Sequence, residues 1–191
     1  MKYENRIFNK STYRGVNPVK KLRLFFQDLK FCVQRIRKGY CDRDIWSIDY
    51  WFLNQIPHML TEFKNTLHGY PQQFNTPEEW DAVLDEMIFL FKEADEDTCS
   101  KANPFDKEYH IAFEEFTEKY GLFGEKLRTP EEIEQDTKKH ARTLHTMSEL
   151  PEYAEIDEKY HNASREIDKY RNECLDNALT MFKEHFHNLW D

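Results

Sequence analysis

The segment TPEEWDAVLDEMIFLF, residues 76–91, decides the fold class because it combines a helix start with a helical apolar period. The Thr76 hydroxyl can cap the first turn, a proline follows at the first helical position, and Glu79 stands where a capping box places its carboxylate. Behind this start, apolar residues recur every three or four positions, which is the period of one buried helix face. They are Trp80, Val83, Leu84, Met87, Ile88 and Phe91.

The same start recurs at Thr129, where a Thr-Pro-Glu-Glu run predicts a more polar helix that extends to about Glu149. From Pro151 to Trp190 no residue interrupts a helix. Apolar positions in this segment alternate by three and four, as in a coiled-coil seam. They are Tyr153, Ile156, Tyr160, Ala163, Ile167, Tyr170 and Cys174. We expect residues 125–191 to form a long helical hairpin, packed on the core or used for dimerisation through residues 153–174.

Two helices are predicted before residue 76. The first spans about residues 18–38, with basic residues on one face and an apolar stripe that we expect to be core. The stripe consists of Val19, Leu22, Phe26, Leu29, Val33 and Ile36. The second, from Asp42 to His68, is apolar on both faces and should be the central helix. A further helix is predicted at about residues 107–120.

The composition agrees with these periods. Only 5 glycines occur among 191 residues, and no Asn-Gly or Asp-Gly pair offers a tight hairpin turn. The sequence therefore predicts an all-α fold, a multi-helix bundle with a long C-terminal helical hairpin or coiled-coil-like arm. Its expected divisions are a basic arm over residues 1–17, a helical core domain over 18–124, and the hairpin over 125–191.

The net charge of −9 conceals a division along the chain. Residues 1–43 contain 12 basic and three acidic side chains, a net of +9, which leaves 15 basic and 33 acidic side chains, or −18, for the remainder. The basic region is expected to meet either an anionic partner or the acidic surface of the protein itself, in the same chain or across an oligomer. Nucleic acid is not expected as a partner, because the acidic remainder would repel a long polyanion.

The sequence favours a cytoplasmic protein without membrane contact. No segment approaches the roughly 18 apolar residues that span a bilayer, and the first residues lack the apolar stretch of a signal peptide. The 4 cysteines are far apart and form no C-x-x-C pair, so reduced thiols are the simplest interpretation.

Asp49 is the first candidate for a functional side chain. It lies four residues from both Ile45 and Leu53, on the apolar side of the predicted central helix. Burial of an unpaired carboxylate costs several kcal/mol, so Asp49 is expected to have a partner. One interpretation is a structural bond to a basic residue of the 18–38 helix. The other is a pocket that binds a ligand or catalyses a reaction.

The candidate binding residues of that pocket, together with two cations of the 18–38 helix, are Asp42, Asp44, Trp46, Asp49, His68, Tyr70, Lys20 and Arg23. No metal site or cofactor is predicted. Glu158 and His161 match only one half of a di-iron carboxylate site. Nucleotide-binding, serine-hydrolase and zinc-protease motifs do not occur in the sequence.

Residues 39–91 contain, in order, GYCDRDIWSIDYW, HGYP and TPEEWDAVLDEMIFLF. This combination resembles a group of uncharacterised small helical proteins of bacteriophages and prophages, which share a GYxDxDxWxxD block, an HGYP turn and an EEWD helix. The resemblance implies a phage-encoded viral protein of the host cytoplasm. It carries over no catalytic residue, and it leaves the N-terminal arm and the C-terminal hairpin uncovered.

These observations favour a non-enzymatic accessory protein that acts by binding. Its expected partner is a host protein or a small anionic ligand, with inhibition of a host-defence protein or sequestration of its ligand as the expected role. Two alternatives stay open: an enzyme or ligand pocket around Asp42, Asp44, Asp49 and His68, and a virion or DNA-packaging component.

Overall fold

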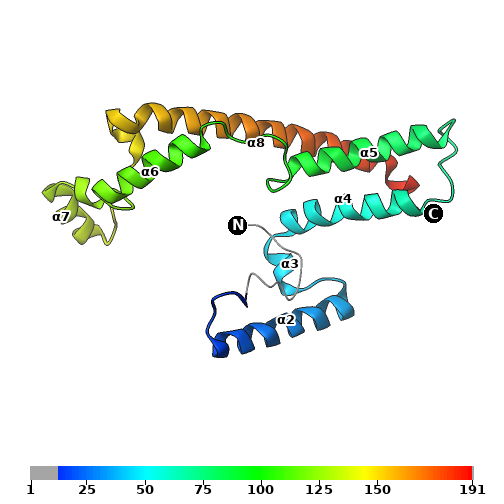
Figure 1. The fold of residues 1–191 in the computed structure, drawn as a ribbon, viewed down its shortest axis with the longest axis horizontal. Coiled ribbons are helices and arrows are strands. Elements are labelled where there is room, and N and C mark those ends of the chain that lie inside the picture. The colour runs from blue at the N-terminus through cyan, green and yellow to red at the C-terminus, as the bar shows by residue number, and fades with distance from the viewer. Residues whose placement is uncertain (1–12, 191) are drawn as a thin grey trace. The chain divides into compact units, whose positions relative to one another are not determined.

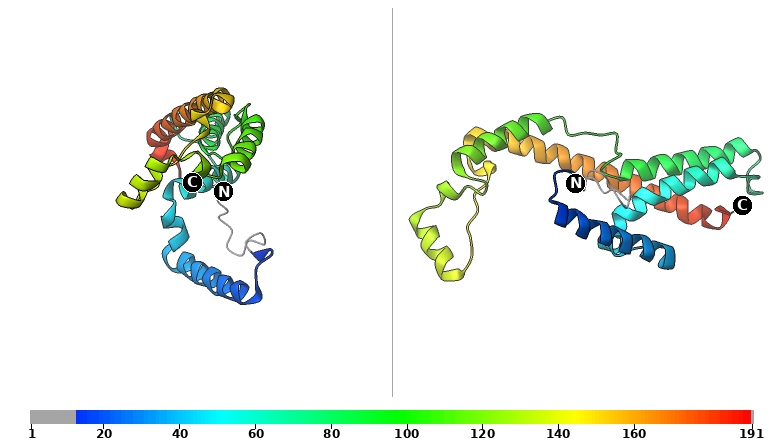
Figure 2. Two further views of the ribbon diagram at one scale, coloured as in Figure 1. Left: turned by 90° about the vertical axis from the view of Figure 1, so that its left-hand side faces the viewer. Right: turned by 60° about the horizontal axis from the view of Figure 1, so that its bottom comes forward.

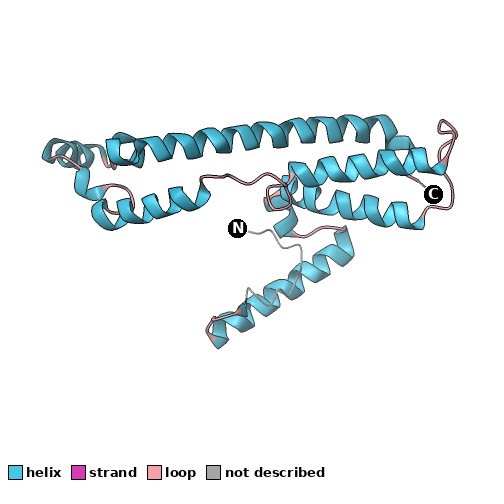
Figure 3. Cartoon of the chain, turned by 45° about the horizontal axis from the view of Figure 1, so that its top comes forward, coloured by secondary structure: helices cyan, strands magenta, loops and turns pink. Residues whose placement is uncertain are grey.

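The computed structural model describes residues 13–190, so the first 12 residues of the predicted basic arm lie outside the described residues. The described part is helical with connecting loops and contains no strand, which confirms the predicted all-α fold class (Figure 3). The α-helices are α2 (Pro18–Lys38), α3 (Asp42–Trp46), α4 (Ile48–Thr66), α5 (Pro77–Ala94), α6 (Asp106–Tyr120), α7 (Pro130–Lys139) and α8 (Pro151–His185) (Figure 1). None of the described helices is long and apolar enough to cross a membrane.

The chain forms two compact units, and their boundaries differ from the predicted ones. The first comprises the residues up to Cys99 together with those from Arg171 onward, and the second comprises Ser100–Tyr170. The predicted boundary at residue 124 does not coincide with either boundary of these units. Helix α8 contributes its first part to the second unit and its last part to the first, and a periodic pattern cannot indicate which helix packs on which.

The core of the first unit is formed by α4, α5 and the last part of α8, with α4 and α5 side by side (Figures 1 and 2). Leu84, Met87 and Phe91 of α5 are fully buried, as the period of residues 76–91 predicts. Phe91 lies edge-on to Phe52 of α4 at 5.7 Å and to Phe182 of α8 at 6.0 Å between ring centroids. Such edge-to-face packing is the favoured geometry for aromatic rings.

The predicted helix from Asp42 to His68 is two helices. Ser47 adopts a non-helical backbone with φ −141° and ψ 78°, and this residue separates α3 from α4. Gly39 ends α2 in the left-handed conformation at φ 80°, and its N–H donates to the Arg35 carbonyl. Because α2 ends at Gly39 and the helix is broken at Ser47, the short α3 helix lies against α2.

The second unit is built on α6 and the first part of α8. Phe116, Met147, Tyr153 and Ile156 form its buried core. The predicted apolar seam of α8 contacts another helix of the same chain, because Tyr160 stacks on Tyr109 of α6 with 3.9 Å between ring centroids. The partner of α8 in this unit is therefore α6, and dimerisation through residues 153–174 stays a prediction.

The helix predicted from Thr129 to Glu149 is shorter than expected. Helix α7 ends at Lys139, where His140 takes a left-handed conformation at φ 50°, and residues 141–146 are not helical. None of the α7 residues is buried. The part of the predicted C-terminal hairpin or coiled-coil-like arm that the structure confirms is its long helix, α8.

Candidate functional site

Helix α2 docks on its own unit through its more polar side. Its only buried residues are Asp28 and Phe31, and Arg35 is partly buried on the same side. At 100° per residue these three positions form one stripe. The apolar stripe predicted to be core lies about 150° away around the helix axis by the same geometry.

Ion pairs hold the docked side of α2. Arg35 donates to both carboxylate oxygens of Asp44, at 3.0 and 2.5 Å, and the Cys41 N–H donates to the same carboxylate at 2.8 Å. Arg43 of α3 lies 3.2 Å from the buried Asp28, which also accepts a hydrogen bond from Tyr13. Burial and the Asp28 carboxylate raise the pKa of Tyr13 to about 12. The α2–α3 corner is therefore a polar and specific joint.

The apolar stripe of α2 faces solvent. We call it the α2 apolar face, and define it by six side chains that are 45 to 85% exposed: Val19, Leu22, Phe26, Leu29, Val33 and Ile36. The prediction that this stripe belongs to the core is wrong. The reason is the α2–α3 corner just described. Asp28, the single acidic residue of α2, forms an ion pair with α3, and the opposite side of α2 therefore faces solvent.

Apolar side chains of the next elements are exposed as well. Trp46, at the end of α3, is 90% exposed, and Ile45 and Ile48 are 53% and 62% exposed. Sequence reasoning placed Ile45 and Ile48 in a buried stripe and so missed them as surface residues. Asp44, one position before Ile45, is the signal that could have shown this. A carboxylate has to face a cation if it is buried.

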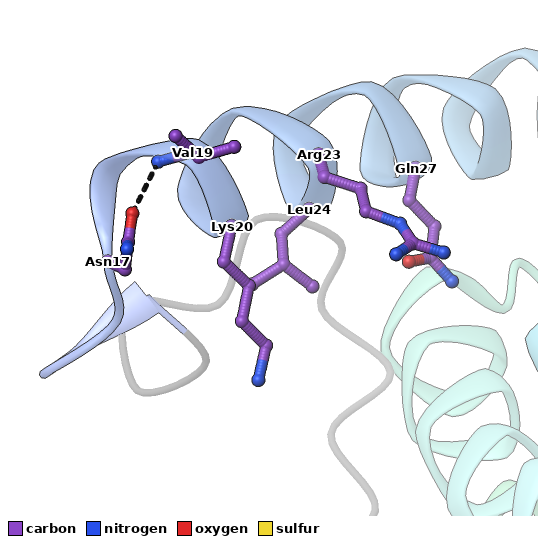
Figure 4. Close-up of a pocket in the computed structure, with 6 residues that line it drawn as sticks. All are labelled: Asn17, Val19, Lys20, Arg23, Leu24 and Gln27. Atoms are coloured by element: carbon purple, nitrogen blue, oxygen red, sulfur yellow. Dashed lines mark hydrogen bonds between the residues drawn. The ribbon is translucent and has the colours of Figure 1, made fainter.

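Lys20 and Arg23, two of the predicted binding residues, line one hollow along the first turns of α2. It has a volume of about 550 Å³, and the other described residues that line it are Asn17, Val19, Leu24 and Gln27 (Figure 4). Asn17 also caps the helix by accepting a hydrogen bond from the Val19 N–H at 2.9 Å. Within the described part of the chain, neither Lys20 nor Arg23 forms an ion pair.

The other predicted binding residues do not form one pocket. Asp42 and Asp44 bind α2, where Lys30 lies 2.7 Å from Asp42. His68 and Tyr70 follow the far end of α4, a helix of 19 residues and thus about 28 Å long. The structure therefore does not bring His68 together with Asp42, Asp44 and Asp49, because the length of α4 lies between them.

Asp49 itself is exposed in the first turn of α4, so the prediction that it is buried is wrong. The break at Ser47 changes the helix phase on which that prediction depended. The structural interpretation applies to another residue, since Asp44 is the carboxylate tied to a basic residue of α2. Burial raises the pKa of Asp44, but the hydrogen bonds from Arg35 and the Cys41 N–H outweigh it and hold that pKa below its ordinary value.

No group of three or more His, Cys, Asp or Glu side chains in the described residues has a metal-binding arrangement. What the α2–α3 region offers chemically is a basic helix with an uncovered apolar side.

Family models, curated proteins and solved structures were each compared with this chain, and none of them matches it.

Proposed function

We propose that this protein acts by binding another protein, and that the α2 apolar face is its binding surface. The observation that carries the proposal is the orientation of α2: its polar side is docked and its six apolar side chains face solvent. Covering one Val, Leu, Ile or Phe side chain contributes about 1.5–3 kcal/mol. A continuous stripe of them on one helix is the recognition surface used when an amphipathic helix binds in a groove.

The charges around this face define the partner. Lys20, Lys21, Arg23 and Arg37 are exposed and form no ion pair with any described residue. At 100° per residue, Arg23 and Arg37 border the α2 apolar face, whereas Lys20 and Lys21 lie toward the docked side. The matching partner is therefore a protein with an apolar groove edged by carboxylates. Two copies of α2 packed on each other would bring like charges together, which is unfavourable at helix edges.

A lipid surface fits less well than a protein. Basic amphipathic helices do bind anionic membranes, but the rest of this chain carries a net charge of −18 that an anionic bilayer would repel. The resemblance to phage proteins adds a biological role to the proposal, in which the bound partner is a host-defence protein and binding inhibits it. Assembly into a virion would instead make the partner another copy of the chain or a further structural protein.

Site-specific photocrosslinking tests the proposal. A photoreactive phenylalanine analogue replaces Phe26 in the α2 apolar face, and a control protein carries it at Phe89, an exposed position of α5. Both proteins are irradiated in extract of the cell that carries the gene. We expect a defined protein adduct at position 26 that is missing at position 89.

The adduct is then challenged with two matched variants. Val33→Asp places a charge in the α2 apolar face and should abolish the adduct, whereas Ile133→Asp on the exposed side of α7 should leave it unchanged. Circular dichroism of both variants should equal that of the wild type. Equal crosslinking at positions 26 and 89, or binding to anionic vesicles in place of any protein, would contradict the proposal.

A further inference from the structure

A second hollow lies in the first unit, at the end of α4 and next to the last residues of the chain. Its volume is about 390 Å³, which is within the range of small-molecule sites. Aromatic rings and side-chain amides dominate its lining, and none of the lining residues that the structure describes is charged. The residues that carry the argument are Tyr70, Gln72, Gln73, Trp80, Asn188 and Trp190.

Trp80 is the informative member of this lining. Its side chain is 1% exposed, packed on Phe74 at 5.1 Å and on His185 at 5.5 Å between ring centroids, and its indole Nε1 has no hydrogen-bond partner. A buried donor that stays unpaired costs about 1–3 kcal/mol, so such groups are rare in folded proteins.

The unpaired groups are concentrated at this place. Across residues 13–190 only three buried side-chain atoms have no hydrogen-bond partner: Trp80 Nε1, His185 Nδ1 and Thr117 Oγ1. The Trp80 and His185 rings are in mutual contact, and of the two residues Trp80 lines the hollow. Two of the three exceptions therefore belong to one aromatic cluster at the edge of the hollow.

We propose that this hollow binds a neutral, planar heterocycle with hydrogen-bond acceptors, the chemistry of a nucleobase. Trp190 and Tyr70 are 74% and 43% exposed and offer ring surfaces on which a flat ligand stacks. Gln72, Gln73 and Asn188 provide paired donor and acceptor groups of the type that reads the edge of a base. Because the described lining residues carry no charge, they offer no cation to a phosphate or carboxylate group inside the hollow.

The proposal for this hollow does not depend on the α2 apolar face, because other residues and a different observation support it. The test uses the full chain labelled with ¹⁵N at its 4 tryptophans, which gives four indole N–H signals. Adenosine is the probe. We expect the Trp80 and Trp190 signals to shift in a saturable manner, while the signal of Trp46 on α3 stays in place.

Three variants make the test specific. Trp190→Ala removes an exposed stacking ring without touching the core and should weaken adenosine binding by about fivefold or more, since stacking contributes about 1–3 kcal/mol per base. Tyr70→Phe keeps the second ring and should bind as the wild type does. Trp46→Phe, in the α3 helix, controls for the loss of a tryptophan.

Two further ligands separate the outcomes. Toluene, which is planar but has no acceptor, should leave the Trp80 N–H signal in place. AMP should bind no tighter than adenosine. A hexanucleotide of deoxyadenosine that binds more tightly than adenosine identifies nucleic acid as the source of the base, and equal affinity identifies a free nucleoside. A Trp80 signal that does not respond to adenosine, or tighter binding of AMP, overturns the proposal.

Discussion

Asp44 and Asp49 are both aspartates and lie five positions apart, but the structure gives them opposite roles. Asp44 is 3% exposed and accepts hydrogen bonds from Arg35 and from the Cys41 N–H. Asp49 is exposed at the start of α4. The difference arises at Ser47, the residue between them, whose backbone interrupts the helix. A sequence pattern reports residue type and spacing, but it does not report a change of helix phase at one residue.

The two aspartates give a matched test of this assignment. Asp44→Ala should lower the free energy of unfolding by about 1–3 kcal/mol at pH 7, because it leaves the Arg35 guanidinium and the Cys41 N–H without their acceptor. Asp49→Ala should change it by less than about 0.5 kcal/mol, as most exposed substitutions do. Urea denaturation measures both. A larger loss for Asp49→Ala would show that the α4 helix starts in another phase.

A second residue-scale feature is the histidine clasp of the second unit, formed by His145, Glu132 and Glu149. His145 Nδ1 lies 2.6 Å from Glu149, and Nε2 lies 3.3 Å from Glu132. Hydrogen bonding to Glu149 is the main cause that raises the pKa of His145 above its ordinary value of 6.5. Hydrogen bonding to His145 is likewise the main cause that lowers the pKa of Glu149 below 4.5.

The clasp predicts a pH window for stability. Because the pKa of His145 is raised by folding, its contribution is complete below pH 6.5 and disappears as the pH rises through the folded-state pKa. The Glu149 contribution is present above pH 4.5 and disappears as the pH falls through the lowered pKa. His145→Gln should therefore lower the melting temperature more at pH 6 than at pH 9. An equal loss at both values would show that the clasp is not an ion pair.

At the scale of elements, helix starts follow the sequence closely. The hydroxyls of Thr76 and Thr129 each accept the N–H of the glutamate three residues later, at 3.3 Å in both cases. Of these two helix starts, only that of α7 has a reciprocal capping box, in which the Thr129 N–H donates to Glu132. At α5 the Glu79 carboxylate accepts from the Asn75 N–H instead.

These two caps make a second matched prediction. Loss of a threonine cap costs about 1 kcal/mol of helix stability. Helix α5 contains eight buried residues and α7 contains none, so only the α5 cap is tied to a core. Thr76→Ala should lower the global free energy of unfolding by about 1 kcal/mol, and Thr129→Ala should lower it by much less. Equal losses would mean that α7 is part of a cooperative core.

Helix packing was less predictable than helix formation. The α5 period identified Leu84, Met87 and Phe91 correctly as core, because this helix has one apolar side. The α2 stripe has the same period, yet it is exposed, since apolar periodicity shows which side of a helix is to be covered and does not show what covers it. The candidate site was missed for this reason, and of the residues that border it only Arg23 had been named as a binding residue.

At the scale of the whole molecule, α8 joins two units that each have their own buried residues. Tyr153 and Ile156 at its start belong to the core of the second unit, and Cys174 and Ala178 belong to the first. All four tryptophans, at positions 46, 51, 80 and 190, lie in the first unit. Tryptophan fluorescence therefore reports the first unit alone, whereas the helical dichroism signal reports both.

This distribution allows the last prediction, which concerns how far the two units unfold together. Ile156→Asp puts a charge into the buried core of the second unit, where an unpaired carboxylate costs several kcal/mol. If each unit is stabilised by its own core, the dichroism transition in urea should split or move to lower urea, while the fluorescence transition should keep its midpoint. Light scattering on the same samples tests the seam, because a seam covered inside the chain predicts an unchanged molar mass. If the variant were a folded monomer and the wild type a dimer, the seam would lie between subunits. If the fluorescence midpoint fell together with the dichroism midpoint, α8 would couple the unfolding of both cores.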